Sequence, residues 1–257
     1  MIDLLYSLAG VLVGLLVGLT GVGGGSLMTP ILVLMFGFHP ATAVGTDLLY
    51  ASATKTAGTA VHGRYGTVDW RVVRRLAMGS LPAAVVTLTI LSFANWQSSA
   101  MAGVISTVLG LALILTAISV FFRKTLIARL TPLFAGDDDA EIGRITIILG
   151  AVLGALVSLT SVGAGALGMT ALLILYPKVP VARLVGSDIA HAVPLTLIAG
   201  LGHLSMGTVN LWLLASLLLG SIPGIIVGSL IATRVSDRVL VPILATTLAI
   251  VGARLLF

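Results

Sequence analysis

The sequence predicts an all-α membrane protein that crosses the bilayer many times, and three observations support this prediction. Of its 257 residues, 58% are hydrophobic and only 9% are charged, whereas soluble domains carry about 25% charged residues. The apolar residues gather into ten segments that short loops separate. Each segment is expected to be a helix, because backbone groups in lipid must be satisfied within the segment. This composition excludes a soluble enzyme, a nucleic-acid-binding domain and a protein with a single membrane anchor.

The ten segments form two halves of five. The first half is expected to contain segments at 2–19, 26–37, 41–61, 71–93 and 99–121. The second half is expected to contain segments at 143–160, 166–176, 180–202, 211–233 and 237–257. Because the longest polar stretch lies between the halves, we expect a first repeat at 1–122, a cytoplasmic linker at 123–142 and a second repeat at 143–257.

The two halves share four motifs in the same order. The matched pairs are GLLVGLTGVGGGSL (14–27) with GALVSLTSVGAGAL (154–167), AVGTD (43–47) with LVGSD (184–188), HGRYGTVDW (62–70) with HLSMGTVNL (203–211), and GSLPA (79–83) with GSIPG (220–224). The partners lie 140 or 141 residues apart throughout. Such a series indicates an internal duplication.

Charge placement predicts the topology. If all ten segments cross, 12 of the 14 basic residues fall on one side: Arg64, Arg71, Arg74, Arg75, Arg123, Lys124, Arg129, Arg144, Lys178, Arg183, Arg234 and Arg238. The positive-inside rule makes that side cytoplasmic and puts both termini outside the cytoplasmic membrane. Six crossings with two re-entrant hairpins, formed by the first two segments of each half, give the same sides. Either arrangement has an odd number of crossings per repeat, so the repeats are expected to be inverted.

Two segments, 26–37 and 166–176, are too short to span the bilayer. Each follows a glycine-rich break, TGVGGGS (20–26) or TSVGAGA (160–166). Short, glycine-interrupted segments at matching places in two halves are typical of a transporter's binding site. Helices that begin near Gly25 and Gly165 would present free N–H groups and partial positive charge to an anion.

We therefore expect a substrate site at these breaks. Glycine lets the backbone approach a ligand, and hydroxyl groups add donors. The expected substrate-binding residues, including the hydroxyls of the two G-T/S-D motifs, are Thr20, Gly23, Gly24, Gly25, Ser26, Thr46, Thr160, Gly163, Gly165 and Ser187. The alternative is that the break glycines only allow close helix crossing. For the stripes of small residues every four positions, such as Gly10–Gly14–Gly18 and Gly220–Gly224–Gly228, helix packing is the favoured interpretation.

Ionisable residues inside the predicted helices are the second candidate set. A charge at the bilayer centre costs at least about 2.5–3.5 kcal/mol, so Asp47, Lys55 and Asp188 are functional candidates, with a structural polar contact as the alternative. His191 lies one turn after Asp188 on the same face. Lys55 and Asp188 share a depth and are predicted to pair in at least one state, which would leave Asp47 to carry a coupling proton or cation. His62, at a membrane border, is expected to make a loop or cap contact, as is His203.

The duplicated pattern resembles the sulfite exporter TauE/SafE family: a glycine-rich break and short helix, a G-T/S-D helix, then H…G-x-V. The most specific part is LTGVGGGSLMTPIL (19–32) with AVGTDLL (43–49). The second copy departs from it, since Ala164 replaces Gly24 and Met169 replaces Thr29. The resemblance implies a cytoplasmic-membrane transporter of a small sulfur-containing anion, such as sulfite, thiosulfate or a sulfonate.

The predicted function is secondary transport of such an anion by alternating access. No G-x-x-x-x-G-K-[ST] motif is present, so an ion or substrate gradient is expected to supply the energy. Neither a cofactor, a metal nor a nucleic-acid partner is expected, and the lipid bilayer is the surrounding partner. A passive anion channel is one alternative. An intramembrane aspartyl protease that uses Asp47 and Asp188 is another, although the surrounding motifs favour a protein that is not an enzyme.

Overall fold

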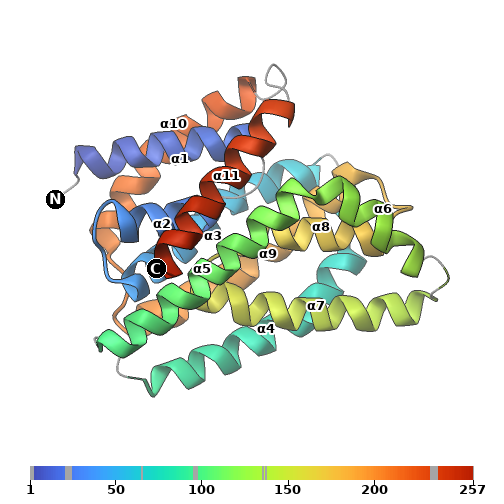
Figure 1. Ribbon diagram of the computed structural model, residues 1–257, viewed down its shortest axis with the longest axis horizontal. Coiled ribbons are helices and arrows are strands. Elements are labelled where there is room, and N and C mark those ends of the chain that lie inside the picture. Colours follow the sequence, from blue (N-terminus) through green and yellow to red (C-terminus); the bar gives the residue numbers. More distant parts are fainter. Residues whose placement is uncertain are drawn as a thin grey trace.

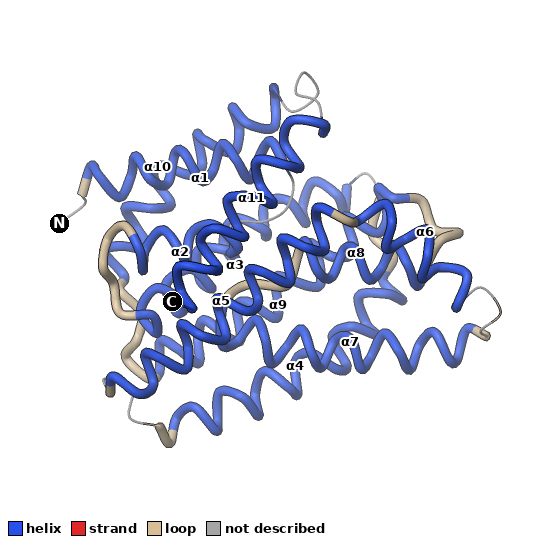
Figure 2. The backbone as a smooth tube through the Cα atoms, viewed as in Figure 1, coloured by secondary structure: helices blue, strands red, loops and turns tan. Residues whose placement is uncertain are grey.

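The computed structural model describes residues 3–20, 25–64, 66–94, 98–134, 136, 138–231 and 237–256. Within these ranges the chain is helical and has no strand (Figures 1 and 2). The helices are α1 (Leu4–Thr20), α2 (Gly25–Leu34), α3 (Pro40–Arg64), α4 (Trp70–Ser92), α5 (Ser99–Phe121), α6 (Arg123–Phe134), α7 (Asp139–Thr160), α8 (Ala166–Leu175), α9 (Val181–Ser205), α10 (Leu211–Ile231) and α11 (Asp237–Leu256). The predicted all-α fold is confirmed.

Ten of these helices match the ten predicted segments, and α6 is additional. It lies in the stretch that the sequence predicts as a linker, and it packs against α8. None of its side chains is fully buried. Long apolar segments do not reveal α6, because this helix has only 12 residues and several of them are polar or charged.

Five helices in the described part of the chain are long and apolar enough to cross a membrane, namely α4, α5, α7, α9 and residues 211–228 of α10. Shorter apolar helices occupy Leu4–Leu19, Ala166–Leu175 and Leu240–Leu256. Exposed aliphatic side chains such as Val86, Ile90, Leu111 and Ile148 give these helices a lipid-compatible surface. The protein is therefore a multi-pass membrane protein, while the number of crossings stays a prediction.

Helices from the two halves pair with one another. The main pairs are α1 with α10, α4 with α7, α3 with α9, and α5 with α11 (Figure 1). If the helices of the halves are matched in order, α1 corresponds to α7 and α10 to α4. The first two pairs are then equivalent, and each of the last two joins a helix to its own counterpart. A two-fold relation between the repeats would produce this set of contacts. Parallel and inverted repeats both have such a relation, so the inversion of the repeats stays a prediction.

The helices α3 and α9 lie between two apolar cores. One core is built from side chains of α1, α2, α5, α10 and α11, among them Met28, Leu113 and Leu217. The other contains Leu76 of α4 and Leu153 of α7, together with side chains of α8 and α9. This position encloses the polar residues of α3 and α9 in the middle of the molecule.

The stripes of small residues are packing faces, as predicted. A Cβ atom added to Gly14 of α1 would lie 2.8 Å from the Cα of Ser221 in α10. The equivalent atom on Gly154 of α7 would lie 2.7 Å from the Cα of Ser80 in α4. Real Cβ atoms do not approach backbone this closely, so both helix pairs need glycine to make contact.

We predict that Gly154→Ala destabilises the protein while Gly103→Ala does not. A Cβ on Gly154 would overlap the α4 backbone, whereas one on Gly103 would meet nothing within 4 Å. Overpacking of this kind costs about 1–3 kcal/mol, and alanine in an open helical position gains up to about 1 kcal/mol. Thermal unfolding in detergent would measure both variants, and equal midpoints for the two would contradict the packing assignment.

Candidate functional site

The predicted acidic residues lie in the two central helices, Asp47 in α3 and Asp188 in α9. Both are almost fully buried, with 0% and 4% exposure respectively. The two helices pack directly on each other, because a Cβ on Gly45 would lie 2.8 Å from the Cβ of His203. Buried carboxylates need hydrogen-bond or charge partners, so their surroundings define the candidate site.

Asp47 receives a hydrogen bond from a helix that follows the first break. The Oγ1 hydroxyl of Thr29 in α2 donates to Oδ2 of Asp47 at 2.5 Å, and both residues are fully buried. Ser161, in the second break, lies near the same carboxylate, although neither its Oγ nor the Oδ1 of Asp47 makes a hydrogen bond within the described chain. Thr29 is not among the site residues predicted from the sequence, although it lies only 18 residues before Asp47 in the first copy.

The second break, between α7 and α8, is fully described. Thr160 closes it: its hydroxyl donates to the Leu156 carbonyl at 2.7 Å and accepts from the Val162 amide at 3.1 Å. The backbone then takes positive φ at Ser161 (61°), Gly163 (124°) and Gly165 (135°). Such conformations favour glycine, so the two glycines are required by the path of the chain between the helices.

The first break lies largely outside the described residues. The helix α1 ends at Thr20 and α2 begins at Gly25, and the predicted site residues Gly23 and Gly24 lie in the undescribed stretch between them. Ser26 is buried in the first turn of α2. The predicted helix starts near Gly25 and Gly165 are both confirmed, since α8 begins at Ala166 with Gly165 as its N-cap.

Lys55 of α3 reaches the second break. Its Nζ donates to the backbone carbonyl oxygen of Ala164 at 3.0 Å. Asp188 is the carboxylate whose charge acts most strongly on Lys55, followed by Asp47. Among the described residues no ion pair joins Lys55 to Asp188, so the direct pair predicted for at least one state is not formed in this structure and stays a prediction.

Asp188 faces the first turn of α8. A Cβ added to Gly168 would lie 2.8 Å from Oδ1 of Asp188, and that buried oxygen has no hydrogen-bond partner within the described chain. Arg123, the first residue of α6, also acts on this carboxylate through its charge. The sequence predicts only a cytoplasmic loop position for Arg123, because nothing in the sequence alone indicates that α6 folds back onto α8.

His191 is tied to a neighbouring helix. Its Nε2 atom and the Oγ of Ser80 in α4 lie 2.8 Å apart, and its Nδ1 is buried without a partner in the described part of the protein. His203 makes the predicted kind of contact: its ring nitrogens lie 2.9 Å from the Thr208 hydroxyl and 2.9 Å from the Ser158 carbonyl. The side chain of His62 is outside the described residues.

Thr46 and Ser187 are used in loop contacts rather than left open to a ligand. The Asn210 amide donates to Oγ1 of Thr46 at 3.1 Å. The Asp69 amide donates to Oγ of Ser187 at 2.7 Å. The two contacts are equivalent in the two halves, and each fixes the loop that precedes a long helix, α10 or α4. We therefore leave both hydroxyls out of the candidate site.

Three charged side chains, those of Lys55, Asp47 and Asp188, form one polar centre together with the start of α8 and the break before it. Both carboxylates are buried and Lys55 is half-buried. Nowhere in the described ranges do three His, Cys, Asp or Glu side chains gather as they would around a metal ion. Lys55 and the N-terminus of α8 are the groups of this centre whose chemistry suits a small anion.

Comparisons with known proteins agree with this architecture. A family model described as "Sulfite exporter TauE/SafE" matches residues 6–255. The "Probable membrane transporter protein YjnA" of Bacillus subtilis (strain 168) is 42% identical over 250 residues, covering 97% of this chain and 98% of that protein. "YdhB" of the same organism, also a probable membrane transporter protein, is 26% identical over 258 residues, covering 96% and 97%. A "Probable membrane transporter protein" of Xylella fastidiosa (strain Temecula1 / ATCC 700964) is 27% identical over 233 residues, covering 89% and 84%. No solved structure matches the chain.

We predict that Thr29→Val destabilises the protein by about 1–3 kcal/mol, because it removes the donor to a buried carboxylate. Thr170→Val is the matched control, since Thr170 is also buried near the start of a short helix but donates only to the Ala166 carbonyl of its own helix. Thermal unfolding in detergent would compare the two variants. The assignment fails if Thr170→Val is as damaging as Thr29→Val, or if Asp47→Ala, which removes the acceptor, leaves the effect of Thr29→Val unchanged.

Proposed function

Because the chain belongs to the sulfite exporter TauE/SafE family, we propose that it is a secondary transporter that moves a small sulfur-containing anion across the cytoplasmic membrane by alternating access. That it is a membrane transporter rather than an enzyme follows from the family and from the relatives named above. The proposed substrates are sulfite, thiosulfate or a sulfonate. The family's description as a sulfite exporter supports this chemical class.

The observation that carries the proposal is the contact between Lys55 and the Ala164 carbonyl. A lysine ammonium has three donors, and this contact uses one of them. The helix α8 begins two residues after Ala164, so its partial positive end lies beside the same ammonium group. An anion held there would accept hydrogen bonds from Lys55 and from the first amides of α8.

Asp188 supplies the exchange step of the proposed mechanism. Lys55 without an anion needs a counter-charge, and Asp188 is the carboxylate that acts on it most strongly. In the proposed cycle Asp188 pairs with Lys55 when the site is empty and releases it when the anion binds. Substrate binding would therefore change the contact between α3 and α9, which come from different repeats.

Asp47 is the proposed coupling residue. Its hydrogen bond comes from the neutral hydroxyl of Thr29, so in the proposed cycle Asp47 takes up a proton or a cation without competing for the proposed pair between Lys55 and Asp188. Protonation would turn Asp47 into a donor and remove its charge from the centre of the protein. The coupled ion would move with or against the substrate as the helices rearrange.

Flux into proteoliposomes tests the function directly. The panel contains sulfite, thiosulfate, a sulfonate, acetate and chloride, each with and without an imposed proton or sodium gradient. We expect saturable flux of at least one sulfur anion that responds to one gradient. Flux that rises linearly with concentration and ignores both gradients would indicate a passive channel instead.

We predict that Lys55→Met and Asp188→Asn each lower flux about tenfold or more, and that the double variant loses much less than the product of the two losses. Removing one member of a buried pair leaves the other charge uncompensated, while removing both does not. Lys178→Met is the control, because Lys178 is exposed in a loop and its loss should leave flux unchanged. Losses that simply multiply in the double variant would contradict the pairing.

The proposed topology is tested by labelling, since the natural chain has no cysteine. Ser99→Cys and Thr125→Cys introduce single exposed positions on either side of the span formed by α5. We expect a membrane-impermeant reagent to label Ser99→Cys from outside intact cells and Thr125→Cys only after the membrane is opened. Labelling of both positions from the same side would contradict the inverted arrangement.

A further inference from the structure

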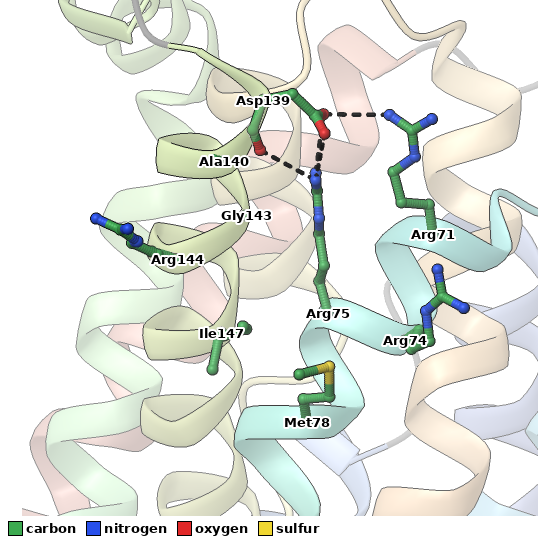
Figure 3. Close-up of a pocket in the computed structure, with 9 residues that line it drawn as sticks. All are labelled: Arg71, Arg74, Arg75, Met78, Asp139, Ala140, Gly143, Arg144 and Ile147. Atoms are coloured by element: carbon green, nitrogen blue, oxygen red, sulfur yellow. Dashed lines mark hydrogen bonds and ion pairs between the residues drawn. The ribbon is translucent and has the colours of Figure 1, made fainter.

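An arginine-lined cavity lies between the first turns of α4 and α7 (Figure 3), and none of the residues that line it belongs to the polar centre. Its volume is about 440 Å³. Four guanidinium groups line it, Arg71, Arg74 and Arg75 from α4 and Arg144 from α7, with Asp139 as the one carboxylate in the lining. The cavity therefore carries a net charge of +3.

Asp139 forms ion pairs with only two of these four arginines. It forms ion pairs with Arg75 at 2.6 Å and with Arg71 at 3.2 Å, and Arg75 also donates to the Tyr176 hydroxyl at 3.2 Å (Figure 3). Arg74 and Arg144 make no hydrogen bond or ion pair with the part of the chain that the structure describes. Figure 3 shows them flanking the ion-pair cluster on opposite sides. Their donors are available to an anion.

The cavity continues into an apolar surface. Met78 and Ile147 line it one turn further along α4 and α7 than Arg75 and Arg144, and Met78 is 58% exposed. Both helices belong to the candidate membrane spans. A ligand that fills this cavity would meet guanidinium groups at one end and aliphatic side chains of a membrane-spanning pair at the other.

The equivalent place in the other helix pair has no such cluster. The pair formed by α1 and α10 packs through glycine in the same way, but Trp212, Ala215 and Ser216 stand where Arg71, Arg74 and Arg75 do. There the Ser7 hydroxyl donates to the Ser216 carbonyl at 2.9 Å. Since the crossing forms without arginines on one side of the protein, packing does not require them on the other, which the predicted topology places in the cytoplasm.

We propose that this cavity binds the phosphate headgroup of an anionic phospholipid from the cytoplasmic leaflet, with an acyl chain lying along Met78 and Ile147. Guanidinium groups suit phosphate because they offer paired donors in a fixed plane. Basic pockets between membrane helices on the cytoplasmic side are where anionic headgroups bind. The lipid joins α4 of the first half to α7 of the second, and this binding is separate from the transported anion at Lys55.

Native mass spectrometry of the purified protein in neutral detergent tests the proposal. The titrants are phosphatidylglycerol, phosphatidylcholine with the same acyl chains, and inorganic phosphate as a competitor. The test variant is Arg74→Gln with Arg144→Gln. The control is Arg129→Gln with Arg254→Gln, which removes the same charge from two exposed arginines outside the cavity. Unchanged elution and thermal unfolding of the variants would show that they are folded.

We expect phosphatidylglycerol to bind the natural protein more tightly than phosphatidylcholine. Each arginine near an anionic lipid is worth about a factor of five, so the test variant should lose about 25-fold in affinity for phosphatidylglycerol. The control variant should keep it. Equal losses of affinity in the test and control variants would show a general effect of charge, and the proposed lipid site would then be wrong. If millimolar inorganic phosphate displaced phosphatidylglycerol, the ligand of the cavity would be a free anion and the proposal of a lipid would be wrong.

Discussion

A helix that is interrupted inside an apolar core must find new partners for the backbone groups that the interruption frees. The hydrogen bond from Lys55 to the Ala164 carbonyl meets this constraint at the second break. Lipid offers no donors, so an open carbonyl at that depth is tolerated only where protein covers it. The donor comes from the other half of the chain, which fixes the position of α3 against the break. The ammonium group of Lys55 that donates to the Ala164 carbonyl is the same group that would bind the proposed substrate anion.

The two halves have matching helices but differ in the side chains at matching positions near the two buried aspartates. Thr29 supports Asp47 in the first half, while Met169 occupies the matching place in the second. Asp188 therefore lacks a hydroxyl donor from its short helix and instead faces Gly168. A duplicated site with identical halves would bind its ligand symmetrically. The charge of Lys55 acts on both carboxylates, but only Asp47 also has a hydroxyl donor, Thr29, and this difference permits two different roles in one cycle.

Much of the fold could be predicted because lipid imposes simple rules on sequence. Long apolar runs are expected to be helices, and a glycine-rich break between them marks where a helix must restart, as at Ala166. The contacts of Thr46 could not be predicted, because a hydroxyl beside a membrane aspartate has the same sequence signal whether it meets a ligand or the Asn210 amide. The role of Arg123 depends on α6 folding back onto α8, and no periodicity in the polar stretch indicates that path.

The glycine contacts limit how the proposed transporter is able to move. Gly14 brings α1 against the α10 backbone, and Gly154 does the same for α7 and α4. Each pair joins the two predicted repeats at backbone distance, where close packing resists sliding. We therefore expect each of these two helix pairs to stay together as the protein moves. The central contact between α3 and α9 is different, because charged side chains and a broken helix meet there and these have alternative partners. Alternating access in this protein is accordingly expected to reorganise the centre between two fixed helix pairs, with Lys55 exchanging its contacts as the two sides open in turn.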